Sequence, residues 1–346
     1  MTQSSRHRLL WGSLAGGAGL IAGGAVLQRQ FMHRIAADPE RAVLSIPPDG
    51  RPLGITSPDG TVLHAEAFGP EDAATIVLGH GWTENLEFWT YQIRALSQRG
   101  LRVIAYDLRG HGDSDRAVGG DYSIERFGED LEAVLAAVVP DGRRAVVAGH
   151  SLGAMAIAAW ARDHEVERRA GAVALINTGL GDLIGEQLLV PVPGVAHALN
   201  KTVAGRAFLG SHAPLPRFST PLIAALVRYV AFGPDATPAQ IAFYERMLIT
   251  SPPDVRASVG ITLSEVELND ALPRLTVPTT VIAGARDRLT PPSHARRIAE
   301  KLPELEQLVI IPETGHMAPL ERPTVVIEAL EELAAKVGYD ADAVAA

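Results

Sequence analysis

The stretch that decides the fold spans residues 145–161 and reads AVVAGHSLGAMAIAAWA. Its first four residues are apolar without alternation, which is typical of a strand buried on both faces. Residues 154–161 are rich in alanine and favour a helix. Between the two, residues 149–153 match the pattern G-x-S-x-G, in which a serine occupies a sharp turn from strand to helix. The stretch therefore predicts Ser151 as a nucleophile held clear of a sheet.

Further apolar runs of strand length follow the same pattern. They are residues 75–78, 103–106, 172–176, 280–283 and 308–311. Amphipathic stretches of helical length separate most of them, as at residues 86–98 and 124–138. A mostly parallel sheet with helices on both faces, an α/β fold, accounts for this order. Residues 61–68 follow a Pro-Asp-Gly turn, which indicates an antiparallel hairpin at a sheet edge.

The alternation of strands and helices is interrupted between residues 176 and 280, where no comparable strand signal occurs. Two helix starts are visible there, because Pro221 follows Thr220 and Pro238 follows Thr237. Gln240 completes a capping box at the second. Helices inserted between two strands predict a cap over the sheet. The expected division is an N-terminal hydrophobic segment at 1–35, a linker at 36–52, a core at 53–178 and 266–340, and a helical cap at 179–265.

A serine hydroxyl needs a base within hydrogen-bond reach and an acid that orients the base. His316 follows the run at 308–311 directly, and Asp287 follows the run at 280–283. The chain order Ser151, Asp287, His316 is the one expected when a serine occupies such a turn. Asp182, shortly after the preceding strand, is the alternative acid.

The backbone N–H groups of Trp82 and Leu152 are the candidates for an oxyanion hole. Trp82 lies in the loop after the run at 75–78, and Leu152 begins the helix after Ser151. The side chain of His80 is interpreted as structural, and His164 and His294 as structural or solvent-exposed. Residues 107–112 (Asp-Leu-Arg-Gly-His-Gly) are interpreted as a structural turn, because the mechanism leaves no role unfilled.

In this order the motifs resemble the α/β-hydrolase superfamily, and specifically the single-domain enzymes with a helical cap after the sixth strand. The resemblance covers roughly residues 53–337. In the related epoxide hydrolases and haloalkane dehalogenases the nucleophile is an aspartate, and Ser151 argues against both chemistries. The resemblance implies acyl transfer to water, in which Ser151 attacks a carbonyl, His316 moves the proton and Asp287 steadies the imidazolium.

Composition excludes several other classes. The chain has 346 residues, 47% hydrophobic and 21% charged, which is typical of globular proteins. A formal charge of −9 disfavours nucleic acid as a partner. The chain has no cysteine, which removes disulfides, thiolate metal sites and a thiol nucleophile. No metal motif is found, and the G-x-G-x-x-A match at residues 17–22 follows no strand, so no cofactor is expected.

The N-terminal region departs from a soluble pattern. An uncharged run of 19 residues extends from Leu9 to Leu27, with arginines on both sides. At 1.5 Å per residue it reaches roughly 28 Å, about the thickness of a hydrocarbon core. A retained single-pass membrane anchor is the favoured interpretation. A cleaved secretory signal and a leader that does neither are the alternatives. The flanking arginines do not fix an orientation.

The favoured function is a serine hydrolase of carboxylic esters, of the carboxylesterase or lipase type. Thioester, lactone or carbon–carbon bond hydrolysis and perhydrolysis use the same three residues and stay open. A non-catalytic module that holds a ligand beneath the cap is the alternative from another class. Apolar residues at 222–232 and 241–248 suggest a small-molecule ester with an apolar group, although they would equally pack the cap helices together.

Overall fold

A computed structural model describes residues 26–183, 210–212, 215 and 218–344, with side chains described to residue 337. Its centre is a sheet of eight strands in the order β1-β2-β4-β3-β5-β6-β7-β8. The strands are β1 (Arg51–Thr56), β2 (Val62–Phe68), β3 (Thr75–Gly79), β4 (Arg102–Tyr106), β5 (Ala145–His150), β6 (Ala170–Ile176), β7 (Thr279–Gly284) and β8 (Leu305–Ile311). Every apolar run that the sequence predicted as a strand lies in this sheet.

The sheet is parallel from β4 to β8, and β2 runs antiparallel to both of its neighbours, β1 and β4. Gly79 at the end of β3 pairs with Gly149 near the end of β5. The register of β7 with β8 likewise pairs Gly284 with Ile311 at their carboxyl ends. The loops after these strands therefore emerge at one edge of the sheet, which is where ligands bind in open parallel sheets.

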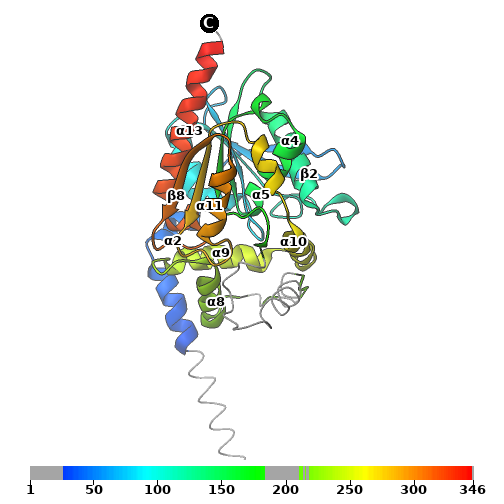
Figure 1. Ribbon diagram of the computed structural model, residues 1–346. Helices are drawn as coiled ribbons and strands as arrows, with labels where there is room; N and C mark the ends of the chain where they lie inside the picture. Colours follow the sequence, from blue (N-terminus) through cyan, green and yellow to red (C-terminus); the bar gives the residue numbers. More distant parts are fainter. Residues whose placement is uncertain (1–25, 184–209, 213–214, 216–217, 345–346) are drawn as a thin grey trace, which may run out of the picture.

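Helices cover both faces of the sheet (Figure 1). The helices of the core are η1 (Leu86–Trp89), α3 (Thr90–Gln98), η2 (Val118–Gly120), α4 (Ile124–Val138), α5 (Leu152–Asp163), η3 (Val166–Arg168), η4 (Asn269–Arg274), α11 (Pro292–Lys301), α12 (Ala318–Glu321) and α13 (Pro323–Val344). Alternate residues of the central strands contribute to two apolar clusters. Val147 packs in the cluster with α4 and α5, whereas Val146 and Ala148 pack in the cluster with α3 and α13.

Three described α-helices lie between β6 and β7, in the region where the sequence predicted a cap. They are α8 (Pro221–Ala231), α9 (Pro238–Thr250) and α10 (Pro253–Glu265). Thr220 caps α8 by accepting from the N–H of Ile223. Thr237 and Gln240 form the predicted capping box at the start of α9. Both helices begin with proline in the first turn, where its missing N–H costs nothing.

The segment expected to be a linker has more structure than its composition indicated. Within residues 36–52, the helix at residues 26–37 ends, α2 (Glu40–Leu44) follows, and β1 already begins at Arg51. Asp38 accepts from the N–H of Ala239 at 2.9 Å, and Glu40 accepts from the Thr237 hydroxyl at 3.2 Å. These contacts tie the segment to the start of α9. A charge-bearing stretch without periodicity thus has a fixed place because its carboxylates bind the cap.

The predicted membrane segment lies outside the described residues except for Val26 and Leu27. No helix in the described part of the chain combines the length and apolar composition needed to cross a membrane.

Candidate active site

Ser151 lies at the turn between β5 and α5, with φ 50° and ψ −112°. Its N–H donates to the carbonyl of Ile176 at 2.9 Å. The turn has no room for side chains on either side. A Cβ on Gly153 would lie 2.3 Å from the carbonyl oxygen of Gly79, and one on Gly149 would lie 2.4 Å from a backbone nitrogen. The two glycines thus permit the strained serine that the G-x-S-x-G pattern predicted.

His316 and Asp287 are in direct contact. The Nδ1 atom of His316 lies 2.8 Å from Oδ2 of Asp287, and both side chains are almost fully buried. Because the carboxylate accepts the Nδ1 proton, the neutral ring carries its free lone pair on Nε2. Ser151 lies at the same edge, since its neighbour His150 has its ring centre 4.9 Å from that of His316.

Asp287 is surrounded by donors. Its Oδ1 accepts from the backbone N–H groups of Leu289 and Thr290, both at 2.9 Å. Its Oδ2 accepts from the Thr290 hydroxyl at 3.0 Å and from Nδ2 of Asn177 at 2.9 Å, besides His316. Burial alone would raise the pKa of Asp287, but the charge and hydrogen bond of His316, with these donors, lower it. The carboxylate therefore stays ionised while buried.

His150 forms a bridge between two loops of the site. Its Nδ1 lies 3.1 Å from Oε2 of Glu84, and its Nε2 lies 2.9 Å from the backbone carbonyl oxygen of His316. Both partners only accept, so both ring nitrogens must carry protons. Burial would lower the pKa of His150, but the Glu84 carboxylate and the carbonyl raise it overall. Glu84 and His150 are thus a buried ion pair.

The candidate oxyanion residues lie at this edge too. Leu152 is the first residue of α5, and N–H groups at a helix start have no partner within the helix. Next to Trp82, the N–H of Gly81 donates to Oε2 of Glu84 at 2.6 Å. The indole N–H of Trp82 donates to the carbonyl of Arg256 in α10 at 3.1 Å. The loop after β3 is therefore fixed both to the ion pair and to the cap.

The cap also contacts the loop that carries His316. The N–H of His316 donates to the carbonyl of Ala231, the last residue of α8, at 2.7 Å. Glu321, almost fully buried, accepts from the N–H of Gly315 at 2.9 Å and from that of Gly233 at 2.7 Å. Burial raises the pKa of Glu321 to about 7 despite these bonds. One carboxyl group thus joins the end of α8 to the histidine loop.

Asp182, the alternative acid, has another neighbour. Its backbone N–H donates to Glu267 at 3.2 Å, and its side chain is exposed. Asp287, not Asp182, is the carboxylate in contact with His316.

Of the three histidines interpreted from the sequence as structural or solvent-exposed, His80 and His294 are buried and His164 is partly exposed. His80 is fully buried, and its Nδ1 faces the carbonyl of Gly81 at 2.8 Å while Nε2 accepts from the N–H of Leu108 at 3.0 Å. Burial lowers the pKa of His80, which keeps it neutral. His294 is buried against Arg297, and His164 is partly exposed.

The turn at residues 107–112 contains a buried ion pair. Arg109 is fully buried and donates from Nε and Nη2 to the two oxygens of Asp130, at 2.7 and 2.6 Å. It also donates to Asp59 at 2.8 Å. The arginine therefore holds the turn to α4 and to the β1–β2 hairpin, which agrees with a structural interpretation.

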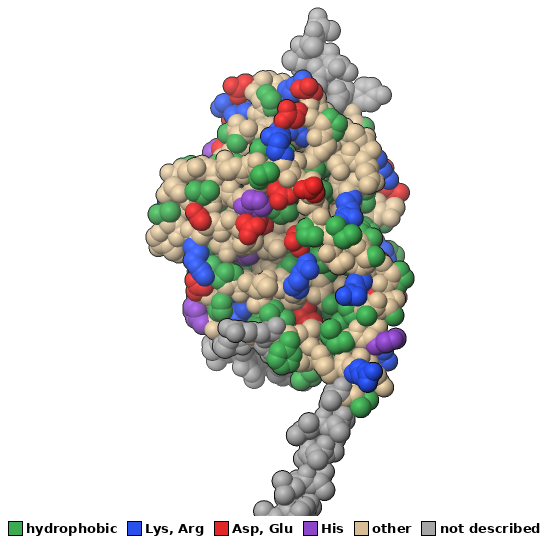
Figure 2. All heavy atoms as spheres, turned by 180° about the vertical axis from the view of Figure 1, so that it is seen from behind, with side chains coloured by type: hydrophobic (Ala, Val, Ile, Leu, Met, Phe, Trp, Pro, Cys, Tyr) green, Lys and Arg blue, Asp and Glu red, His purple; other side chains and the backbone are tan. Residues whose placement is uncertain are grey.

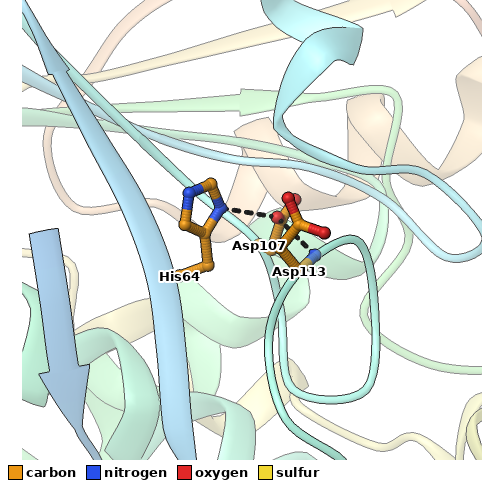
Figure 3. Close-up of side chains that lie close together, drawn as sticks. All are labelled: His64, Asp107 and Asp113. Carbon is orange, nitrogen blue, oxygen red and sulfur yellow. Dashed lines mark hydrogen bonds and ion pairs between the residues drawn. The ribbon is translucent and has the colours of Figure 1, made fainter. Parts of the chain in front are cut away.

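One group in the described part of the chain is compact enough to share a metal ion, namely His64, Asp107 and Asp113 (Figure 3). Asp107 already accepts from the N–H of Leu86 at 2.7 Å, from that of Asp113 at 2.9 Å and from Nδ1 of His64 at 3.0 Å. The hydrogen bond to Asp107 raises the pKa of His64. A metal would have to displace that proton, so the donor set fits an ion pair between β2 and the loop after β4.

Sequence reasoning missed several residues of the site. Asn177 and Thr290 hold Asp287, Glu84 and His150 form the ion pair, and Glu321 joins cap and core. His150 lies inside the G-x-S-x-G motif, and this was the one signal available. The others become visible only when distant segments of the chain are brought together.

The chain is similar to known proteins in both sequence and structure. A family model described as alpha/beta hydrolase fold matches residues 74–323. A non-heme haloperoxidase of Rhodococcus erythropolis is 27% identical over 76% of this chain and 92% of its own. A non-heme chloroperoxidase of Streptomyces lividans is 36% identical, over 34% of this chain and 42% of its own. A solved structure, a thermophilic esterase from Thermogutta terrifontis, has a TM-score of 0.65 at 25% identity, covering 83% of this chain and 99% of its own.

Proposed function

Because the chain belongs to the alpha/beta hydrolase family, we propose that it is a serine hydrolase that cleaves a carboxylic ester through an acyl-enzyme intermediate. The observation that carries the proposal is the contact of His316 with Asp287 at the edge where Ser151 occupies its strained turn. The similarity to a solved esterase supports ester cleavage.

In this mechanism the Ser151 hydroxyl attacks the ester carbonyl while Nε2 of His316 takes its proton. The carbonyl oxygen becomes an oxyanion, which the N–H groups of Trp82 and Leu152 stabilise, each by about 3 kcal/mol. His316 returns the proton to the departing alkoxide, and the alcohol leaves. His316 then takes a proton from water, which attacks the acyl-serine. The acid is released, and His316 returns the proton to the Ser151 oxygen. Asp287 holds Nδ1 and stabilises the imidazolium in both steps.

Labelling with a fluorophosphonate tests the nucleophile. Ser151 should be modified covalently, as located by peptide mass spectrometry. Ser151→Ala should lose roughly 10⁵-fold or more in kcat without loss of fold, the scale found when a serine nucleophile is removed. An unmodified Ser151 in a protein that still binds small ligands would favour the ligand-holding module.

A second candidate activity is perhydrolysis, which the haloperoxidase relatives favour. Hydrogen peroxide would replace water in attacking the acyl-serine, and a peracid would leave instead of an acid. Peracid formation from acetate and hydrogen peroxide distinguishes it from simple hydrolysis. Thioester, lactone and carbon–carbon bond cleavage are further chemistries of the same residues.

We propose a small-molecule ester with an apolar group as the substrate, and retention at a membrane by the run from Leu9 to Leu27. Hydrolysis of p-nitrophenyl esters of increasing chain length tests the first point, and a preference for acetate would contradict it. N-terminal sequencing of protein from the membrane fraction tests the second, because a cleaved signal would remove the run.

A further inference from the structure

Large apolar side chains gather at one end of the molecule. In the helix at residues 26–37, Val26, Leu27 and Met32 are exposed by about half. This helix lies beside the start of α8, because Nε2 of Gln28 donates to the carbonyl of Ser219 at 2.9 Å. Figure 1 shows both helices at the same end of the molecule.

Large apolar side chains also lie on the exposed face of α8. Its buried residues are Ala224, Val227 and Ala231, with Ile223 packed partly buried against the core, whereas Leu222, Leu226 and Tyr229 are 80%, 58% and 46% exposed. The spacing of the three exposed residues places them on one face of the helix. An amphipathic helix of a soluble domain directs its large apolar residues inward. This face of α8 is therefore built to contact something apolar outside the described structure.

The two helices form one surface, which we call the apolar end. Twelve large apolar side chains are exposed in the described part of the chain, and the apolar end holds seven of them: Val26, Leu27, Met32, Phe218, Leu222, Leu226 and Tyr229. The other five are scattered singly, as is normal on a protein surface. A gathering of this kind marks an interaction site.

The charge of the apolar end is of one sign. Residues 26–37 and 218–231 contain Arg29, Arg34 and Arg228 and no Asp or Glu, although the whole chain carries −9. Arg288 adds a fourth cation, with its guanidinium 4.4 Å from the centre of the Tyr229 ring. Figure 2 shows apolar, basic and histidine side chains together at the lower end of the molecule in that view. Large apolar residues among arginines fit the interface of an anionic membrane.

The sequence indicates the same partner independently. The uncharged run from Leu9 to Leu27 enters the described structure at Val26, on the apolar end itself. We propose that the apolar end docks onto a lipid bilayer that contains anionic lipids. In this arrangement α8 lies against the headgroup region with Leu222, Leu226 and Tyr229 toward the acyl chains.

Docking would place the membrane close to the chemistry. The carbonyl of Ala231, at the end of α8, accepts from the N–H of His316. The helix that meets lipid thus also holds the histidine loop. Resting on the proposed esterase function, we assign to the enzyme esters that reside in the bilayer, drawn toward the site past α8.

A fluorescent probe tests the docking directly. The chain has no cysteine, so Leu226→Cys can be labelled at one position with the environment-sensitive dye NBD. The full-length protein is reconstituted into vesicles of phosphatidylcholine and phosphatidylglycerol, with and without a spin-labelled lipid as quencher. The matched control is Ile261→Cys, an exposed apolar position on α10. We expect a blue shift and quenching by lipid at position 226, and neither at position 261.

Three outcomes would overturn the docking. Emission at position 226 that ignores the quencher rules out lipid contact. A blue shift already present in detergent, without quenching in vesicles, assigns the surface to another segment of this chain. A shift that depends on the ratio of protein to lipid assigns it to a second copy.

Activity tests the assignment of substrate. Leu222→Glu combined with Leu226→Glu should lower hydrolysis of a long-chain ester in vesicles at least tenfold and leave p-nitrophenyl acetate hydrolysis in water unchanged. Ile261→Glu should change neither rate. Equal loss on both substrates would contradict a docking role. If the wild type cleaves no ester, the proposed function fails, and the quenching result still decides the docking.

Discussion

The Nε2 atom of His150 lies 2.9 Å from the backbone carbonyl oxygen of His316, while its Nδ1 faces Glu84. The residue before the proposed nucleophile therefore positions the loop of the proposed base. We expect His150→Gln to lower kcat by roughly 10 to 100-fold, because small displacements of reacting groups cost that much. KM should change little. Steady-state kinetics provide the measurement, and His164→Gln, at a partly exposed position, is the control. An unchanged kcat would show that the contacts of His150 with Glu84 and the His316 carbonyl do not position the base.

The same ion pair predicts a pH dependence of stability. Because the folded protein raises the pKa of His150, it binds that proton more tightly than the unfolded chain does. The stabilisation is complete below about pH 6.5, the unfolded value, and is lost as the pH rises through the folded pKa. The difference in unfolding free energy between wild type and His150→Gln should therefore shrink above pH 6.5. Urea titrations across that range measure it, and a constant difference would exclude a charged His150.

The raised pKa of Glu321 predicts that the free energy of unfolding also changes with pH in a lower range. Its pKa is about 7 in the folded protein, against 4.5 for an ordinary exposed glutamate. Between those values the folded state binds the proton and the unfolded state does not, so stability falls as the pH rises, by about 3 kcal/mol in all. Glu321→Gln lacks this titration and should gain on the wild type between pH 5 and pH 8. Parallel stability curves for the two proteins would show that Glu321 does not titrate there.

Gly153 tests the tightness of the nucleophile turn. A Cβ there would lie 2.3 Å from the Gly79 carbonyl oxygen, whereas a Cβ on Gly54 meets nothing within 4 Å. Gly153→Ala should cost about 1–3 kcal/mol or more through overpacking, and Gly153→Val should damage folding. Gly54→Ala is the matched control and should be nearly neutral. Thermal melts compare the variants, and equal effects at both positions would mean that the turn relaxes.

Arg109 should carry more stability than any exposed arginine. Removing one partner of a buried ion pair leaves an uncompensated charge and costs about 3–5 kcal/mol. We expect this for Arg109→Ala, which strands Asp130. Arg126→Ala breaks only partly exposed ion pairs at the surface and should cost much less than Arg109→Ala. A small loss at Arg109, measured by urea unfolding, would indicate that water replaces the guanidinium.

The sheet could be predicted because its strands are buried on both faces and therefore read as unbroken apolar runs. β8 shows the limit, since its first residues, Leu305 to Gln307, are exposed at the sheet edge and carry no such signal. The contact of His316 with Asp287 was predictable because each residue directly follows a strand, and parallel strands end together. Partners such as Glu84 and Glu321 were not, because a buried carboxylate resembles a surface one until its distant neighbours are known.

The contacts of Asp38 and Glu40 with α9 decide where the protein can be shortened for crystallography. Composition alone would mark everything before the first strand as dispensable. A version that begins at Arg51 would lose the carboxylates that accept from Ala239 and Thr237. The start of α9 would then lack these two hydrogen bonds. A shortened form that keeps Asp38 preserves the cap as it sits in the whole protein.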